Sequence, residues 1–342
     1  MSRKKDDPEH VKLAKELEGM LETIRTKQKA IEDATLESVC AEVPTLPRPK
    51  LHTRVHLRGH LDKVNDVHFS GDARLDEKEN SWSYGGKLDR WMAHSRHVTL
   101  YIVNLHVNAR PEHSVAVVVY AFVFQFSSRS HCVSGSLDGK LIIWDAWTGN
   151  KTQIIPLKSS WVMISVWDVD KGKQKTEFFG HEGDITAISI IPKDRNTCLS
   201  ASADKTAKIW DLRMGGATAC AQTFFGHESD VNGAEYYPTA EGVVTSSDDK
   251  TAKLFDRRSD HELATYKTQS AASSLTRCAL SVSGRILFVG SDDSSVHMWD
   301  TLKCQYLGNL CAHESKITGL SMTSNGVALA TSSWDHSVRI WG

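Results

Sequence analysis

The stretch Ser202-Ala203-Asp204-Lys205-Thr206-Ala207-Lys208-Ile209-Trp210-Asp211 is one of five copies of a single pattern in this chain. The other four copies begin at Ser136, Ser247, Ser291 and Ser333. In every copy an Asp follows the first Ser by two residues, and an aromatic residue follows that Asp by six. The aromatic residues of the last four copies are Trp210, Phe255, Trp299 and Trp341. They are spaced 45, 44 and 42 residues apart, which indicates a repeated supersecondary unit.

Each unit also has a head in which His follows a small residue. The heads are Gly59-His60, Gly180-His181, Gly226-His227 and Ala312-His313. A Gly-His head and a Trp-Asp tail at this period are typical of the WD40 blade, a four-stranded sheet. One blade cannot bury both of its faces, so several must pack around a ring. The pattern therefore predicts an all-β WD40 β-propeller of the seven-bladed type.

The recurring His, Ser, Asp and Trp are expected to form a buried hydrogen-bond network in each blade. Phe255 has no N–H, so one blade should lack that donor. The residues assigned to the network are His60, Asp138, Trp144, His181, Ser202, Asp204, Trp210, His227, Asp249, Asp293, Trp299, His313, Asp335 and Trp341. Because the set recurs in every blade, it indicates a structural role and not a single Ser-His-Asp catalytic site.

Composition excludes several classes of function. With 41 basic and 42 acidic residues, the net charge of −1 argues against a nucleic-acid-binding protein. The seven cysteines are scattered without a CxxC pair, which is typical of a reduced cytoplasmic protein without a structural zinc. No phosphate-binding, dinucleotide-binding or metal-ligand motif occurs, so we expect neither an enzyme nor a cofactor or metal. The sequence shows no signal peptide, and no apolar run reaches the roughly 20 residues that a membrane span needs.

Residues 1–43 are expected to form a helix with a heptad seam. Apolar residues recur there at alternating steps of three and four residues. The seam residues are Ala14, Leu17, Leu21, Ile24, Gln28 and Ile31. A partner helix would cover this seam, and the alternative is that the helix packs on its own propeller. Three prolines make 44–50 an extended linker.

The propeller itself should occupy residues 51–342. Since the chain ends just after a third strand, residues 51–58 are expected to supply the fourth strand of the last blade. From His60 to Trp144 is 84 residues, against 28 or 29 in the complete blades. We therefore interpret 75–130 as an anomalous insert, either a real loop insertion or a translated intron.

The opposite irregularity follows the insert. Trp144 and Trp167 are only 23 residues apart, which suggests that about 60 residues are missing near 163–164. The pattern contains six blade endings, and the blade that closes at Trp167 is expected to be truncated. The endings are Trp144, Trp167, Trp210, Phe255, Trp299 and Trp341.

Several phrases resemble the β subunits of heterotrimeric G proteins. They include Leu57-Arg58-Gly59-His60, residues 138–145 and 155–163, and Gly226 to Asn232. Residues 63–69 and 132–140 look most like the visual, photoreceptor subtype. The resemblance covers about 8–74 and 131–342 and leaves out the insert.

The resemblance implies a non-catalytic subunit that passes receptor signals to effectors, in phototransduction. The N-terminal helix would form a coiled coil with a γ subunit, whose prenyl group would hold the protein at the inner face of the plasma membrane. The helix residues implied in γ binding are Leu17, Leu21, Ile24, Gln28 and Ile31. One face of the propeller would bind the GDP form of the α subunit and, alternatively, effectors. The residues implied there are Lys63, Lys140, Ile142, Asn150, Lys151, Trp161, Met163, Asp184, Asp230, Asn232, Asp248 and Trp334.

A WD40 scaffold for protein complexes outside G protein signalling is the alternative. The helix discriminates between the two, because a G protein β subunit needs a γ partner on it and an adaptor does not.

Overall fold

The computed structural model describes residues 19–20, 22–23, 36–58, 66–67, 99–103, 122–125, 131–136, 140–145, 150–156, 162–168, 173–191, 196–268 and 273–342. The chain forms two compact units, Met1–Thr45 and Leu46–Gly342.

In the first unit, the described residues are largely helical. Residues 19–20 and 22–23 are helical, and the Thr23 hydroxyl donates to the Gly19 carbonyl oxygen at 2.7 Å. Helix α2 spans Leu36–Val39. The seam residues assigned to γ binding, and Ala14 with them, lie outside the described residues, so the coiled coil stays a prediction.

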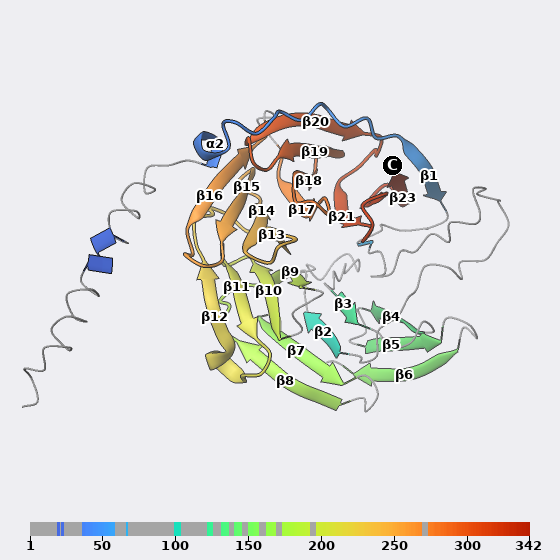
Figure 1. The fold of residues 1–342 in the computed structure, drawn as a ribbon. Helices are drawn as coiled ribbons and strands as arrows, with labels where there is room; N and C mark the ends of the chain where they lie inside the picture. The colour runs from blue at the N-terminus through green and yellow to red at the C-terminus, as the bar shows by residue number, and fades with distance from the viewer. Residues whose placement is uncertain are drawn as a thin grey trace, which may run out of the picture. The chain divides into compact units, whose positions relative to one another are not determined.

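Three of the repeats fold into consecutive four-stranded antiparallel sheets (Figure 1). The first sheet contains β9 (Ile185–Ile190), β10 (Thr197–Ser202), β11 (Ala207–Asp211) and β12 (Cys220–Phe224), with the 3-10 helix η1 (Gly216–Ala219) before β12. The second contains β13 (Val231–Tyr236), β14 (Gly242–Ser247), β15 (Thr251–Asp256) and β16 (Glu262–Lys267). The third contains β17 (Leu275–Leu280), β18 (Ile286–Ser291), β19 (Ser295–Asp300) and β20 (Gln305–Cys311). All residues of β10 and β14 are buried, as expected for strands covered on both faces.

The last sheet joins the two ends of the second unit. It contains β21 (Ile317–Met322), β22 (Leu329–Ser333), β23 (Ser337–Trp341) and, as its outer strand, β1 (Thr53–Arg58). β1 runs antiparallel to β23, with Leu57 opposite Val338. The expected closure of the last blade by residues 51–58 is therefore confirmed.

The blade that closes at Trp167 has four strands in the structure. β7 (Met163–Asp168) and β8 (Lys173–Phe179) supply two of them, and β2 (Thr99–Val103) and β3 (Phe122–Gln125) supply the others. β2 pairs antiparallel with β7, and β3 with β2. Both added strands come from the segment interpreted as an insert. β2 pairs the backbone groups along the edge of β7 that a truncated blade would leave unpaired, and β3 in turn pairs with β2.

A further sheet precedes β7 in the chain. It contains β4 (His131–Ser136), β5 (Lys140–Asp145) and β6 (Lys151–Pro156). The described residues thus form six sheets, in agreement with the six blade endings in the sequence.

Apolar side chains between neighbouring sheets make up the core. Phe178 of one sheet packs with Trp210 of the next, and Phe224 packs with Phe255. The inner strands approach closely: a Cβ at Gly233 would lie 2.9 Å from the Thr276 carbonyl oxygen of the following sheet. Gly233 is therefore needed for the contact between two blades.

Residues 46–51 lie against the end of this unit. Leu46 and Leu51 pack on the cluster that contains Trp341, and an Arg48 guanidinium nitrogen donates to the Asn309 carbonyl oxygen at 3.2 Å. The segment 44–50, predicted as a linker, thus contains residues that pack on the propeller unit.

Candidate interaction site

Each complete blade contains a buried chain of hydrogen bonds. In the β9–β12 sheet, the Trp210 indole N–H donates to the Ser200 hydroxyl at 2.8 Å, and Ser200 contacts His181 Nε2 at 2.7 Å. His181 Nδ1 lies 2.6 Å from Asp204 Oδ2. Since an ionised Asp can only accept, Nδ1 carries a proton, and in the neutral ring Nε2 accepts from Ser200. Each polar group in this series of hydrogen bonds therefore has a partner.

The hydroxyl in this network differs from the predicted one. Ser202, two residues before Asp204, donates to the Gly183 carbonyl oxygen at 2.9 Å and accepts from the Asp204 N–H at 3.1 Å. It therefore stabilises the neighbouring turn. In the β10–β11 register Trp210 lies opposite Cys198. Its indole extends to Ser200, which lies two residues further along β10. Ser200 lies on the same side of the strand as Ser202, which is why spacing alone did not separate them.

Two other sheets show the same arrangement with threonine. His313 bridges Asp335 and Thr331, and the Trp341 indole donates to Thr331 at 3.0 Å. His227 bridges Asp249 and Thr245 at 2.7 Å on each side. Phe255 packs there without a donor, so the expectation that this blade lacks the indole bond is confirmed.

The β17–β20 sheet takes its histidine from a different place. His297, on β19, contacts Asp293 at 3.3 Å and the Tyr306 hydroxyl at 3.0 Å. Its ring is buried beside Trp299. The network predicted from the sequence did not include His297. Its position two residues before Trp299 was the available signal, because alternate strand residues share a face.

Buried hydrogen bonds keep the blade aspartates ionised. Burial alone would raise the pKa of Asp335, but hydrogen bonds from Ser337 and His313 outweigh it and lower that pKa to about 2. The pKa values of Asp204 and Asp249 are lowered in the same way against the effect of burial. Burial lowers the pKa of His313, which favours its neutral ring, although Asp335 acts in the opposite direction.

These shifts predict that the fold loses stability in acid. A lowered folded-state pKa means that the unfolded chain binds more protons, so the free energy of unfolding falls as pH decreases. For His313 the loss begins below its usual pKa of about 6.5, and for the aspartates below about 4, toward their folded-state values. Each such carboxylate contributes on the order of 1–2 kcal/mol. Urea unfolding from pH 8 to pH 2 should show this decline, and a flat profile would contradict it.

Residues at one end of four consecutive sheets are joined by an equivalent backbone bond. The N–H of a residue in the turn before the third strand donates to a carbonyl oxygen in the loop before the first strand. The pairs are Ala203 with Asp184 at 2.8 Å, Asp248 with Asp230 at 3.0 Å, Asp292 with Ser274 at 3.1 Å and Trp334 with Lys316 at 3.1 Å. We call these eight residues the loop–turn face. Since each sheet places its pair at the same end, they form one surface of the propeller.

The loop–turn face contains four of the residues implied in α-subunit binding. They are Asp184, Asp230, Asp248 and Trp334, all half-buried. Asn232 joins this face to the next blade, because its amide donates to Asp248 Oδ1 at 2.5 Å and to the Leu275 carbonyl oxygen at 2.8 Å. The Lys316 ammonium lies 5.7 Å from the centroid of the Trp334 ring. Four aspartates and one lysine make the face predominantly acidic.

The remaining implied residues are distributed differently. Asn150 and Lys151 are exposed at the start of β6. Lys140 and Ile142 lie on β5. Met163 is only 6% exposed on β7, which leaves its side chain little surface for a partner. Lys63 and Trp161, like the network residues His60 and Asp138, lie outside the described residues, and Trp144 lies on β5.

Comparisons with known proteins agree with the WD40 fold. The family model described as G protein beta WD-40 repeat protein matches residues 164–342, which is more than half of the chain. The model for the WD domain, G-beta repeat, matches residues 107–145. A guanine nucleotide-binding protein subunit beta from Zea mays is 30% identical over 296 residues, covering 62% of this chain and 77% of the relative. The chain belongs to the G protein β WD-40 repeat family.

Other G protein β relatives agree at similar identity. Subunit beta-1 from Nicotiana tabacum and subunit beta from Arabidopsis thaliana are each 29% identical over 294 residues, covering 62% of this chain and 78% of the relative. Membership makes the protein a non-catalytic scaffold subunit, so the blade histidines and aspartates are structural. The match to residues 107–145 begins inside the segment interpreted as an insert.

The described residues carry no other evident chemistry. They include no group of His, Cys, Asp or Glu side chains that could hold a metal ion. In the part of the chain that the structure describes, no helix is long and apolar enough to cross a membrane. The face residues that sequence reasoning missed are Ala203, Ser274, Asp292 and Lys316. Asp292 has the same place in its repeat as Asp248, so the repeat itself could have identified it.

Proposed function

We propose that this chain is a working β subunit of a heterotrimeric G protein, which pairs with a γ subunit and binds the GDP form of an α subunit through the loop–turn face. The observation that carries the proposal is that Asp184, Asp230, Asp248 and Trp334, which come from three blades, lie at the same end of their sheets. A rigid, acidic rim with one large aromatic residue suits a partner that offers basic side chains around an apolar pocket.

The same surface would serve effectors once the α subunit leaves, because two partners on one rim exclude each other. The γ subunit would cover the N-terminal seam and, through its lipid, bring the dimer to the inner face of the plasma membrane. Receptors would act on it indirectly, through the α subunit. A role in phototransduction rests on the phrases at 63–69 and 132–140, and detection of the protein in photoreceptor cells tests it.

Replacement of Trp334 tests the assignment of the loop–turn face. Trp334→Ala should weaken binding of the GDP-bound α subunit by about tenfold or more, since central aromatic residues dominate many interfaces. The change removes the side chain and keeps the backbone bond to Lys316. Affinity can be measured by surface plasmon resonance with the co-purified dimer.

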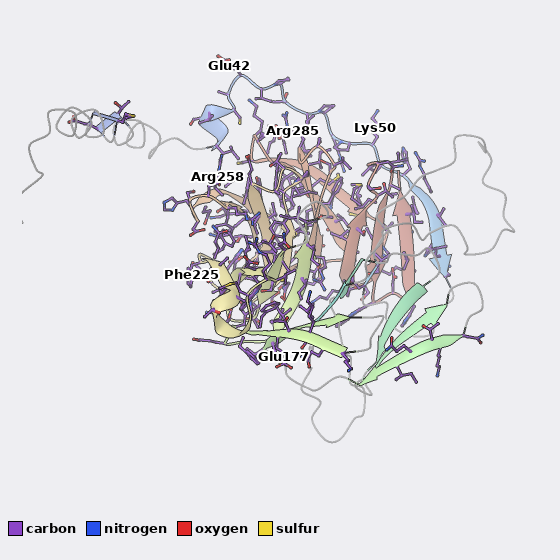
Figure 2. All side chains as sticks on the ribbon, turned by 60° about the horizontal axis from the view of Figure 1, so that its bottom comes forward. Glu42, Lys50, Glu177, Phe225, Arg258 and Arg285 are labelled. Atoms are coloured by element: carbon purple, nitrogen blue, oxygen red, sulfur yellow. The ribbon has the colours of Figure 1, made fainter. Side chains whose placement is uncertain are left out.

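The matched control is Phe225→Ala. Phe225 is 71% exposed next to β12 and is labelled at the border of the molecule in Figure 2. Phe225 begins the loop that ends at Asp230, but it adjoins the outer strand β12, whereas Asp230 adjoins the inner strand β13. Its replacement should therefore leave α binding unchanged. Equal affinity of wild type and Trp334→Ala would remove Trp334 from the site. Failure to bind any γ or α subunit would favour the scaffold alternative.

A further inference from the structure

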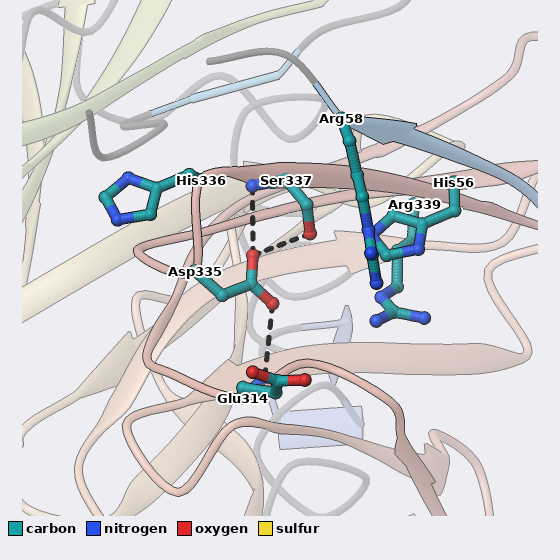
Figure 3. Close-up of a pocket in the computed structure, with 7 residues that line it drawn as sticks. All are labelled: His56, Arg58, Glu314, Asp335, His336, Ser337 and Arg339. Atoms are coloured by element: carbon teal, nitrogen blue, oxygen red, sulfur yellow. Dashed lines mark hydrogen bonds between the residues drawn. The ribbon is translucent and has the colours of Figure 1, made fainter. Parts of the chain in front are cut away.

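The closing strand pair β1–β23 lines an open pocket of about 320 Å³ (Figure 3). In the register of this pair, His56 lies opposite Arg339 and Arg58 opposite Ser337. Alternate residues of a strand share a face, so these four side chains project from the same side of the sheet. Glu314, Asp335 and His336 complete the lining. In Figure 3 the side chains of Arg58, His56 and Arg339 lie together, with Asp335 and Glu314 across from them.

The two arginines lack anionic partners among the described residues. Arg339 Nε is buried without a hydrogen-bond acceptor. Arg58 Nε donates to His56 Nε2 at 3.2 Å, which leaves its other guanidinium nitrogens available. An unsatisfied buried donor is unfavourable, and so are like charges on neighbouring strands. A bound anion would accept a hydrogen bond from this donor and would offset the two positive charges.

The carboxylates of the pocket do not neutralise this charge. Asp335 Oδ2 contacts His313 Nδ1 at 2.7 Å and accepts from the Glu314 N–H at 3.1 Å. Asp335 Oδ1 accepts from the Ser337 N–H at 3.0 Å and the Ser337 hydroxyl at 2.6 Å. This carboxylate is fully used in the blade network. Glu314 is exposed at the rim and forms no ion pair with either arginine in the described chain.

Positive charges dominate the surroundings of His56. Its pKa is lowered by burial and then by the charges of Arg339 and Arg58, while Asp335 and Glu314 act in the opposite direction. The two guanidinium groups change this pKa more than the two carboxylates do. The ring therefore lies in a field that favours an anion.

We propose that this pocket binds a phosphate group through Arg58 and Arg339. Guanidinium groups form paired, charge-assisted hydrogen bonds with phosphate oxygens, and a bound phosphate would give Arg339 Nε its missing acceptor. The group would come either from free phosphate or from a phosphorylated Ser or Thr side chain of a partner protein. Such a site borders the loop–turn face, because Asp335 follows Trp334 and Glu314 precedes Lys316 by two residues, but its two arginines are not part of that face. Phosphate binding can therefore be measured without an α subunit, and neither proposal depends on the other.

Titration calorimetry at constant ionic strength with the full chain, co-purified with γ if required, tests the site. The probes are a short glycine–serine peptide with one phosphoserine, its unphosphorylated twin, and inorganic phosphate. Arg58→Met and Arg339→Met should each weaken phosphate-dependent binding by about tenfold. Glu314→Gln should strengthen it several-fold, because one rim carboxylate is lost. Arg258→Met is the control, since Arg258 is bonded to Asp256 on another sheet.

The outcomes separate the two sources of phosphate. Binding of the phosphopeptide alone assigns the site to a phosphorylated partner, and binding of inorganic phosphate assigns it to free phosphate. Equal binding of both peptides, no binding of any probe, or full binding by the Arg58→Met variant would overturn the proposal. Arg58 is exposed on an outer strand, so that variant remains informative even if Arg339→Met fails to fold.

Discussion

Trp210→Ala is expected to lower the free energy of unfolding by about 3–5 kcal/mol. The Trp210 side chain is fully buried and packs against Phe178, with ring centroids 6.0 Å apart, and against His181 at 5.7 Å. Its removal would leave a cavity between two blades and take one donor from Ser200. Both losses act on the contact that holds neighbouring sheets together.

Trp210→Phe separates the two contributions. The phenyl ring keeps most of the packing and loses only the indole bond, as in the natural arrangement of Phe255 beside His227. Since Ser200 keeps its contact with His181, the cost should be about 1–2 kcal/mol. Urea unfolding followed by far-UV circular dichroism measures both variants, with exposed Met214→Ala as the control. Equal stability of the Ala and Phe variants would contradict the role of packing.

Leu21→Glu combined with Ile24→Glu is expected to abolish assembly with γ. The two residues occupy successive positions of the heptad seam, where a coiled coil buries apolar side chains against its partner. Two carboxylates there would have to be desolvated without partners, which costs several kcal/mol. The measurement is co-purification of the chain with a tagged γ subunit.

Gly19→Glu combined with Thr23→Glu is the matched control. It adds the same charge to the same helix, at exposed positions away from the seam. Assembly with γ should survive this change. If the seam variant also co-purifies with γ, the coiled-coil proposal fails, and the helix covers its seam in another way.

Much of the fold could be predicted because the same residues recur at a nearly constant spacing. The spacing of Trp210, Phe255, Trp299 and Trp341 identified the blades, and a blade without a fourth strand required the closing strand at 53–58. The acidic positions Asp184, Asp230 and Asp248 came from the family resemblance, and the repeated loop–turn bond explains why they share one end of the sheets. Local pattern was sufficient there because each blade repeats the same short-range contacts.

Only the tertiary structure decided contacts between segments that no pattern relates. Ser200 and Ser202 share one side of β10, and only the reach of the Trp210 indole selects Ser200. His297 replaces a head histidine from within a strand, because an ionised aspartate accepts from any donor that its surroundings place nearby. β2 pairs with β7, and β3 with β2, although their sequence departs from the repeat, since backbone hydrogen bonding does not depend on side-chain identity. The period of the sequence determines which strands form, and the need to pair every strand edge determines their neighbours.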